Sequence, residues 1–317
     1  MKRNFIYKLI PLVLAGIFML AGCAEVAEDV PVVTEQVTEP EKQPYPVTIG
    51  SLVFNSSPET AASLSPAITE IIAELGFESK LTGRSSYCTY PESIASCADL
   101  GSSANPDVDA VIANAPQLLV SQSPIAKKDI TAIEAAGTRV LIISTPSSVE
   151  ELYGLYGNLY KVFKGETEDE TAVISGKFTK LEEVFAKYEN MLGSYAYILS
   201  HDLAAASDST FAGDFFSHFG SNCAADSEDN TITAEKLLEA DPDWLILSAY
   251  MSIDDLPEEL GELSAVKNKR IIVLDETAAG FLERPTSRVY LVAEYVSHYM
   301  NAVLDETSAE ETEENSD

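Results

Sequence analysis

The chain has 317 residues and a mass of 34.3 kDa, which is enough for two lobes of ordinary domain size. Its hydrophobic content of 46% supports packed cores, and its formal net charge is −31. Because so acidic a surface repels phosphate backbones, the composition argues against nucleic acid as a partner.

The N-terminus has the features of an exported lipoprotein. A basic start is followed by an apolar stretch over 9–20, which is short for a membrane span, and then by Leu-Ala-Gly-Cys ending at Cys23. This motif resembles the bacterial lipobox. We predict a signal peptide over 1–22, a lipid on Cys23 that anchors the protein at the extracytoplasmic face of the membrane, and a disordered acidic linker over 23–46. An ordinary signal peptide or a single anchor helix is the alternative.

The body alternates strand and helix patterns. The first lobe covers residues 47–165. We predict that it begins with a strand over 47–54 and a helix that Ser65 caps, with Pro66 at its first position. A strand over 80–83, a polar-aromatic loop over 84–91, a helix over 125–136, a strand over 139–143 and a helix over 149–163 follow. A long helix over 166–192 connects the lobes, or is an ordinary crossover helix within one of them.

The second lobe, residues 193–304, repeats this scheme. We predict strands over 195–199 and 270–274, a helix over 211–219, and a last helix that opens at Leu282-Glu283-Arg284-Pro285 and ends near Leu304. An acidic tail over 305–317 is predicted to be disordered.

One unit occurs in both lobes: a short helical pattern, a proline and a dense apolar run. Aligning Pro116 with Pro242 pairs the run 118–120 with 244–246, and pairs Asp109 with Glu235, each seven residues before its proline. Such runs are typical of strands buried on both faces, as in parallel sheets. The two acids are either first-turn residues favoured by the helix dipole or matching contacts for one basic partner.

No enzyme signature is present. The sequence has no P-loop and no dinucleotide-binding glycine pattern, and its histidines, His201, His218 and His298, are scattered. Ser65 has no glycine elbow, so an esterase mechanism is not supported. We predict no catalytic residue, no cofactor and no metal site, and few histidines are available for free zinc or manganese.

Three cysteines remain after Cys23. Cys88 and Cys97 flank a loop and form either a disulfide, which would persist in an exported protein, or two buried thiols. Cys223 is left unpaired and is expected to be buried and inert.

Several stretches together resemble a known family. LSPAITEIIAELG, GRSSYCTYP and DVDAVIANAPQLLV look like the N-terminal lobe of the cobalamin-binding proteins of ABC importers, and FAGDFFSHFGSNCAAD, TAEKLLEADPDWLIL and LERPTSR look like their C-terminal lobe. The wider family binds cobalamin, ferric siderophores or haem. The resemblance implies an α/β fold of two Rossmann-like lobes, each with a central mostly parallel sheet, joined by one long connecting helix.

The resemblance also implies roles for individual residues. Asp109 and Glu235 would dock on arginines of the permease. Tyr87 would lie against the corrin unless it packs on its own loop, and Arg284 would meet an anionic group unless it pairs with Glu283 or another acid. The remaining predicted ligand contacts are Ser65, Pro66, Arg84 and Tyr250.

The chain departs from the cobalamin-binding pattern in its tryptophans. Some relatives flank the ligand with tryptophans where this chain has Ser103 and Gln122, and its one tryptophan, Trp244, lies in a predicted core strand. Tyr90, Tyr250 and Phe281 are candidate replacements. We predict a monomeric binding protein that delivers a corrinoid to an ABC permease. A ferric siderophore or haem is the alternative cargo, and a surface adhesin or sensor is the alternative function.

Overall fold

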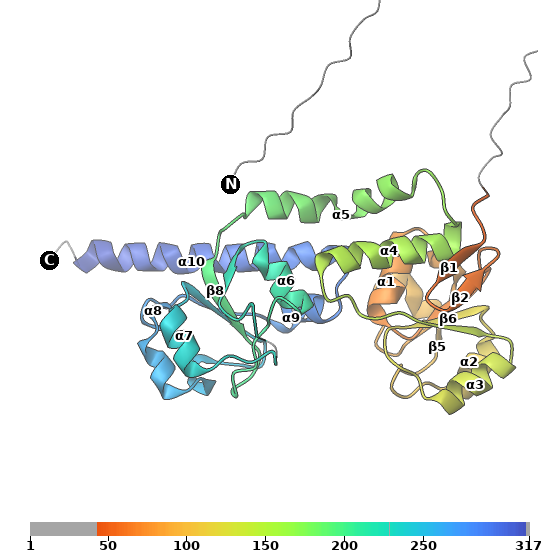
Figure 1. The fold of residues 1–317 in the computed structure, drawn as a ribbon, viewed down its shortest axis with the longest axis horizontal. Helices are drawn as coiled ribbons and strands as arrows, with labels where there is room; N and C mark the ends of the chain where they lie inside the picture. The colour runs from red at the N-terminus through yellow and green to blue at the C-terminus, as the bar shows by residue number, and fades with distance from the viewer. Residues whose placement is uncertain (1–42, 228, 315–317) are drawn as a thin grey trace, which may run out of the picture. The chain divides into compact units, whose positions relative to one another are not determined.

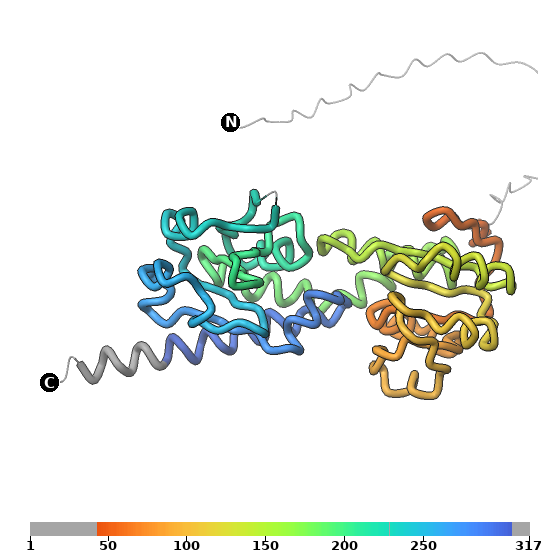
Figure 2. Tube along the Cα trace, turned by 90° about the horizontal axis from the view of Figure 1, so that it is seen from below, coloured from red at the N-terminus to blue at the C-terminus, as the bar shows by residue number. Residues whose placement is uncertain are grey.

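The computed structural model describes residues 43–227 and 229–314. The predicted signal peptide, the lipidation site at Cys23 and most of the predicted linker lie outside these residues. The described chain forms two lobes, each built on one parallel sheet (Figure 1). Figure 2 follows it from red and yellow in the N-terminal lobe to cyan and blue in the C-terminal lobe. Across the described ranges, every helix is too short or too polar to span a membrane.

The N-terminal sheet has the strand order β5-β4-β3-β6-β7, and all of its neighbouring strands are parallel. The strands are β3 (Ala61–Ser63), β4 (Leu81–Arg84), β5 (Ala98–Asp99), β6 (Leu118–Ser121) and β7 (Arg139–Ile142). The helices between them are α1 (Pro66–Glu74), η1 (Glu78–Lys80), η2 (Glu92–Ser96), α2 (Val108–Asn114) and α3 (Lys127–Ala135). Before β3, the predicted single strand over 47–54 is instead an antiparallel hairpin of β1 (Val47–Ile49) and β2 (Leu52–Phe54). Gly50, with a φ of 58°, allows the turn between them.

The C-terminal sheet has the order β11-β10-β8-β9 and is also parallel. Its strands are β8 (Gly193–Ile198), β9 (Gly220–Asn222), β10 (Trp244–Leu247) and β11 (Ile271–Val273). Its helices are α6 (Phe211–Ser217), α7 (Ala234–Ala240), η3 (Ile253–Asp255), η4 (Glu258–Glu262), α8 (Ser264–Lys267), α9 (Glu276–Glu283), η5 (Ser287–Val289) and α10 (Tyr290–Glu314).

The repeated unit is confirmed in detail. Helices α2 and α7 both have seven residues, and strands β6 and β10 both have four fully buried residues. Both helices end in a left-handed C-cap, at Ala115 with a φ of 47° and at Asp241 with a φ of 40°. Because each unit has the same turn before its strand, equivalent residues of α2 and α7 occupy equivalent places on their sheets.

Two helices connect the lobes. Helix α4 (Val149–Lys164) begins beside α6, where the Val149 N–H donates to Asp214 Oδ2 at 2.7 Å, and then packs along α1. Helix α5 (Glu170–Lys187) leads from the end of α4 to β8, so it is the long connecting helix, somewhat shorter than the predicted 166–192. The side chains of α4, α5 and α10 join the inner faces of both sheets in one continuous hydrophobic core.

The opposite faces of the two sheets have separate cores. Val111 of α2 packs with Leu119 and Val140 in the N-terminal lobe. Leu237 of α7 packs with Leu245 and Leu247 in the C-terminal lobe. In Figure 1, α2 and α7 accordingly lie on the side of the sheets away from α4, α5 and α10.

Three predicted boundaries are wrong. The segment Leu282–Pro285 ends α9 rather than opening the last helix, because Asp275 caps α9 and the residue before a proline avoids helical geometry. Helix α10 continues to Glu314 rather than ending near Leu304 as predicted. The last residues of the predicted linker are ordered, since the Tyr45 hydroxyl donates to the Val162 carbonyl at 3.0 Å.

Candidate functional site

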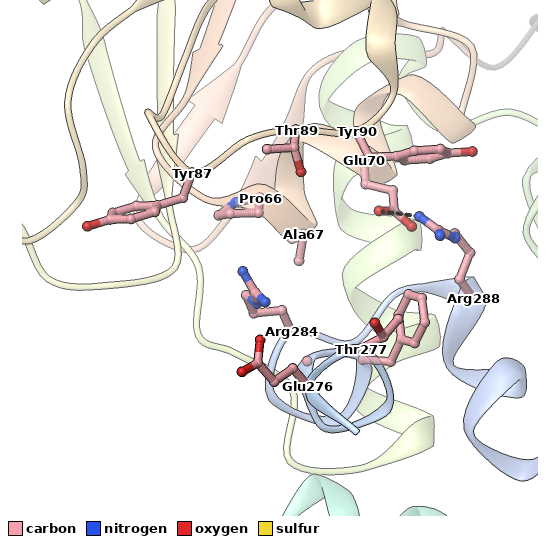
Figure 3. A pocket seen from close by; sticks show the side chains of 12 residues that line it. Pro66, Ala67, Glu70, Tyr87, Thr89, Tyr90, Glu276, Thr277, Arg284 and Arg288 are labelled. Atoms are coloured by element: carbon pink, nitrogen blue, oxygen red, sulfur yellow. Dashed lines mark hydrogen bonds and ion pairs between the residues drawn. The ribbon is translucent and has the colours of Figure 1, made fainter. Parts of the chain in front are cut away.

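A cavity of about 240 Å³ lies between the lobes. One wall is the start of α1 with the loop after β4, and the other is α9 with η5 (Figure 3). These segments follow the carboxyl ends of β3, β4 and β11, where parallel α/β sheets commonly bind ligands. The lining residues are Pro66, Ala67, Glu70, Tyr87, Thr89, Tyr90, Glu276, Thr277, Gly280, Phe281, Arg284 and Arg288.

The N-terminal wall presents two tyrosines. The side chain of Tyr87 is 67% exposed and lies at the edge of the cavity, so it does not pack on its own loop. The Tyr90 ring lies beneath the Arg288 guanidinium, with Cζ 4.2 Å from the ring centroid. Tyr87 therefore offers a flat apolar face to a ligand, whereas Tyr90 is already partly covered by a cation.

The C-terminal wall presents Arg284. This residue caps the end of α9, and its guanidinium projects into the cavity above the helix (Figure 3). Gly280 makes room for it, because a Cβ there would lie 3.1 Å from Arg284 Nη2. Among the described residues no ion pair to Glu283 or to any other acid holds Arg284. Its positive charge is available to a ligand.

A second hollow, of about 360 Å³, lies on the other side of α9. It is lined mainly by apolar side chains at the carboxyl ends of β8 and β10, among them Leu199, Phe211 and Leu282. Tyr250, which is 78% exposed, stands at this hollow. Helix α9 therefore separates a polar cavity that contains Arg284 from an apolar one.

The other predicted ligand contacts differ in their placement. Pro66 lines the cavity, but Ser65 is buried, and its Oγ accepts the Gln122 N–H at 2.8 Å rather than capping α1. Arg84 does not line the described cavity. Its Nη1 donates to the Ser85 carbonyl at 3.0 Å and lies 3.9 Å from Asp99 Oδ2. Trp244 is only 4% exposed and belongs to the core, as predicted.

Sequence reasoning missed a polar contact between the lobes at the base of the cavity. Glu70 of α1 accepts the Thr286 hydroxyl at 2.7 Å and pairs with Arg288 Nη1 at 3.3 Å. The Arg288 guanidinium also lies over the Phe281 ring, 5.0 Å from its centroid. Glu70 is buried, so this pair is screened less by solvent than a surface ion pair.

One turn along α1, Glu74 makes a second set of contacts. Its Oε2 accepts the Ser287 hydroxyl at 3.0 Å and also the Tyr156 hydroxyl, while the Ser287 N–H donates to Tyr156 Oη at 2.8 Å. Burial, together with the charge of Glu70, raises the pKa of Glu74 despite these hydrogen bonds. We call Glu70, Glu74, Tyr156, Thr286, Ser287 and Arg288 the clasp.

The clasp has a faint signal in the sequence. Glu70 and Glu74 lie four residues apart in α1, beside the stripe of isoleucines that marks its buried face. Acids so close to a buried stripe need partners, and the hydroxyls and arginine of Thr286-Ser287-Arg288 supply them. The sequence does not show that these segments meet, because more than 200 residues separate them.

The two equivalent acids, Asp109 and Glu235, lie in the first turns of α2 and α7. Both are exposed, and neither serves as the helix cap: Asp107 accepts the Ala110 N–H at 2.9 Å, and Thr233 accepts the Lys236 N–H at 3.2 Å. Capping by other residues leaves both carboxylates available on the side of the sheets away from the shared core.

The described cysteines are free thiols. Cys88 is buried with its Sγ 3.2 Å from Thr69 Oγ1, and Cys97 Sγ donates to the Leu81 carbonyl at 3.2 Å. The bridge between them is therefore absent, because each sulfur is turned to a different partner. Burial raises the pKa of Cys88, Cys97 and Cys223, which disfavours reactive thiolates. No group of three metal-ligating side chains was found within 43–227 and 229–314.

Comparison with known sequences relates most of the chain to one family. The profile of the periplasmic binding protein family matches residues 62–278. Among curated proteins, the uncharacterized ABC transporter substrate-binding lipoprotein YvrC of Bacillus subtilis (strain 168) is 24% identical over 281 residues, covering 83% of this chain and 88% of YvrC.

Solved structures have the same fold. The periplasmic vitamin B12 binding protein BtuF of Vibrio cholerae matches with a TM-score of 0.58 and 21% identity, covering 78% of this chain and 98% of BtuF. The periplasmic haem binding protein HutB of Vibrio cholerae matches with a TM-score of 0.62 and 17% identity, covering 77% of this chain and 98% of HutB. At these identities the likeness shows the shared two-lobed architecture.

Proposed function

The chain belongs to the periplasmic binding protein family, and on that basis we propose that it captures a corrinoid between its lobes and delivers it to the permease of an ABC importer. Family membership makes it a solute-binding protein rather than an enzyme, in agreement with the expectation from sequence. The cavity between the lobes is the natural place for the solute.

The observation that carries the proposal is an unpaired arginine in a cavity flanked by exposed tyrosines. Arg284 has no ion pair among the described residues, although acids outnumber bases by 51 to 20 in the whole chain. In so acidic a protein an arginine finds a surface partner readily, so one left facing a cavity fits a ligand that carries an anionic group.

A corrinoid matches both parts of this arrangement. Its broad, flat ring suits the exposed face of Tyr87, and its phosphodiester suits Arg284. The vitamin B12 binding protein BtuF shares the fold. A ferric siderophore remains the alternative cargo, because tyrosine and arginine also suit its polar groups. No affinity for any such chelate would favour the adhesin or sensor function instead.

Delivery requires the protein to stay at the membrane and to dock on a permease. We assign the anchor to a lipid on Cys23, in line with the naming of YvrC as a lipoprotein. We assign docking to Asp109 and Glu235, which are exposed at equivalent points of the two lobes and form no ion pair among the described residues. Two carboxylates on one side of the molecule suit paired basic pockets on one partner.

Calorimetric titration tests the cargo. We expect cyanocobalamin to bind the wild-type protein, and Arg284→Gln to weaken it by on the order of tenfold or more, because a charge-assisted hydrogen bond is lost. Arg270→Gln, an arginine away from the cavity, is the matched control and should bind like wild type. Absence of corrinoid binding, or equal loss in both variants, would refute the assignment.

Haem is a second candidate, favoured by one observation. Tyr87 is exposed at the cavity edge, and a tyrosine oxygen can ligate ferric haem iron. The haem binding protein HutB also shares the fold. If haem is the cargo, binding will shift the visible absorption spectrum of haem, and Tyr87→Phe will change the spectrum of the bound haem. If the cargo is a corrinoid, Tyr87→Phe will leave the spectrum of the bound corrinoid unchanged.

A further inference from the structure

The charged residues that line the cavity are balanced. Among the described lining residues, Glu70 and Glu276 are acidic and Arg284 and Arg288 are basic. A ligand that enters therefore meets no net positive charge, in contrast to a site built to hold several anionic groups. The balance suggests that the protein selects its ligand partly by charge.

The two arginines are not equivalent. Arg288 is held by the Glu70 carboxylate at 3.3 Å and lies between the Tyr90 and Phe281 rings, at 4.2 and 5.0 Å from their centroids. Glu70 is itself fixed by the Thr286 hydroxyl at 2.7 Å. Within the described residues Arg284 has neither an ion pair nor an aromatic ring stacked on it. One cation is thus occupied and the other is available.

We propose that Glu70 determines the charge of the ligand that this cavity accepts. By holding Arg288 it leaves Arg284 as the one cation that the described lining offers, so the site favours ligands with at most one anionic group at this wall. The inference rests on the proposed binding function. Such a site would favour a corrinoid, which has a single phosphodiester, or an uncharged ferric trihydroxamate. It would disfavour haem, which has two carboxylates, and a trianionic ferric tris-catecholate.

The physical basis is the cost of placing a second anion near Glu70. A ligand carboxylate that approaches Arg288 must either displace Glu70, which would leave a buried carboxylate without its cation, or sit beside it and be repelled. Neither cost applies to a ligand whose only anionic group reaches Arg284.

The test compares Glu70→Gln with Glu74→Gln. Glutamine at position 70 can still accept the Thr286 hydroxyl, but it no longer neutralises Arg288. Glu74→Gln makes the same change one turn along α1, in the clasp but outside the cavity lining, and is the matched control. Affinities are measured for cyanocobalamin, an uncharged ferric trihydroxamate, haem and a ferric tris-catecholate.

We expect the wild type to prefer the first two probes. Glu70→Gln should strengthen the binding of haem or the tris-catecholate by on the order of tenfold and leave the uncharged chelate within about twofold, while Glu74→Gln changes neither ratio. If Glu70→Gln folds poorly, Arg288→Gln serves instead. It leaves Glu70 without its cation and should weaken every anionic probe.

The outcomes separate the two proposals. The charge selection would be overturned if the wild type bound haem or the tris-catecholate more tightly than the first two probes. It would also be overturned if Glu70→Gln left the ratios of these affinities unchanged. Either result would leave a chelate-binding function in place. Wild-type protein and variants that bind none of the four probes would overturn the proposed function, and the charge selection with it.

Discussion

Removing one hydroxyl from the clasp tests whether it holds the lobes together. The ring of Tyr156 is fully buried in α4, and its hydroxyl donates to Glu74 and accepts the Ser287 N–H at 2.8 Å. Tyr156→Phe keeps the ring but leaves the Ser287 N–H without this partner and removes a hydrogen bond from a buried carboxyl group. Hydrogen bonds to such groups contribute about 1.5–3 kcal/mol, so we expect the free energy of unfolding to fall by about 3 kcal/mol.

Tyr160→Phe is the matched control. It makes the same substitution one turn later in α4, where the hydroxyl bonds to Thr167 and Asp169 at an exposed turn that water can solvate. We expect a loss of about 1 kcal/mol or less there.

The assay is urea unfolding followed both by circular dichroism, which reports on both lobes, and by the fluorescence of Trp244, the one tryptophan. The shared core predicts coincident transitions. Two results would refute the view that the clasp and the core join the lobes into one cooperative unit. One is a Tyr156→Phe protein that is no less stable than Tyr160→Phe. The other is a wild-type protein whose unfolding transitions differ between circular dichroism and fluorescence.

Three other expectations follow from the same structure. Because the pKa of Glu74 is raised above its ordinary 4.5, the folded state holds this proton more tightly than the unfolded chain. The stability that Glu74 contributes through this proton is complete below pH 4.5 and is lost as pH rises through the raised pKa. The melting temperature of wild type minus that of Glu74→Gln should therefore fall from acid to neutral pH. A difference that does not depend on pH would contradict the raised pKa. Asp109→Ala with Glu235→Ala should leave corrinoid affinity unchanged and abolish permease binding in a pull-down, whereas Glu239→Ala, also exposed on α7, should affect neither; loss of ligand affinity would place the acids at the cleft. Small-angle scattering should show little change in radius of gyration on ligand addition, and a large compaction would argue against lobes fixed by the clasp.

The sequence predicts the repeated parts of the fold well because their signals are local. Leu118–Ser121 and Trp244–Leu247 are dense apolar runs that follow a proline, and such runs are typical of strands covered on both faces. The equal spacing of Asp109 and Glu235 before those prolines then places them on equivalent helices. The helix α4 is predicted within a residue because its apolar positions recur at helical spacing.

The parts that sequence reasoning missed depend on tertiary packing. Strand β3 reads Ala-Ala-Ser, which has no β-branched residue, yet it is the central strand of its sheet. Its small side chains are required there, since a Cβ at the neighbouring Gly83 would already lie 3.2 Å from the Ala62 Cβ. Arg84 is a predicted ligand contact, but as the last residue of β4 it pairs with Asp99 of the edge strand β5, and its Nη1 lies 3.9 Å from Asp99 Oδ2. Only the folded chain shows which polar residues face the cavity.

The clasp and the cavity share residues, and this links rigidity to selectivity. Glu70 and Arg288 line the cavity while they join α1 to η5, so the groups that fix the lobes also fix the charge that a ligand meets. Wide opening of the cleft would separate Glu70 from Arg288 and expose a second cation to the ligand. A site that selects by charge therefore needs lobes that move little, and the continuous core across α4, α5 and α10 provides that restraint.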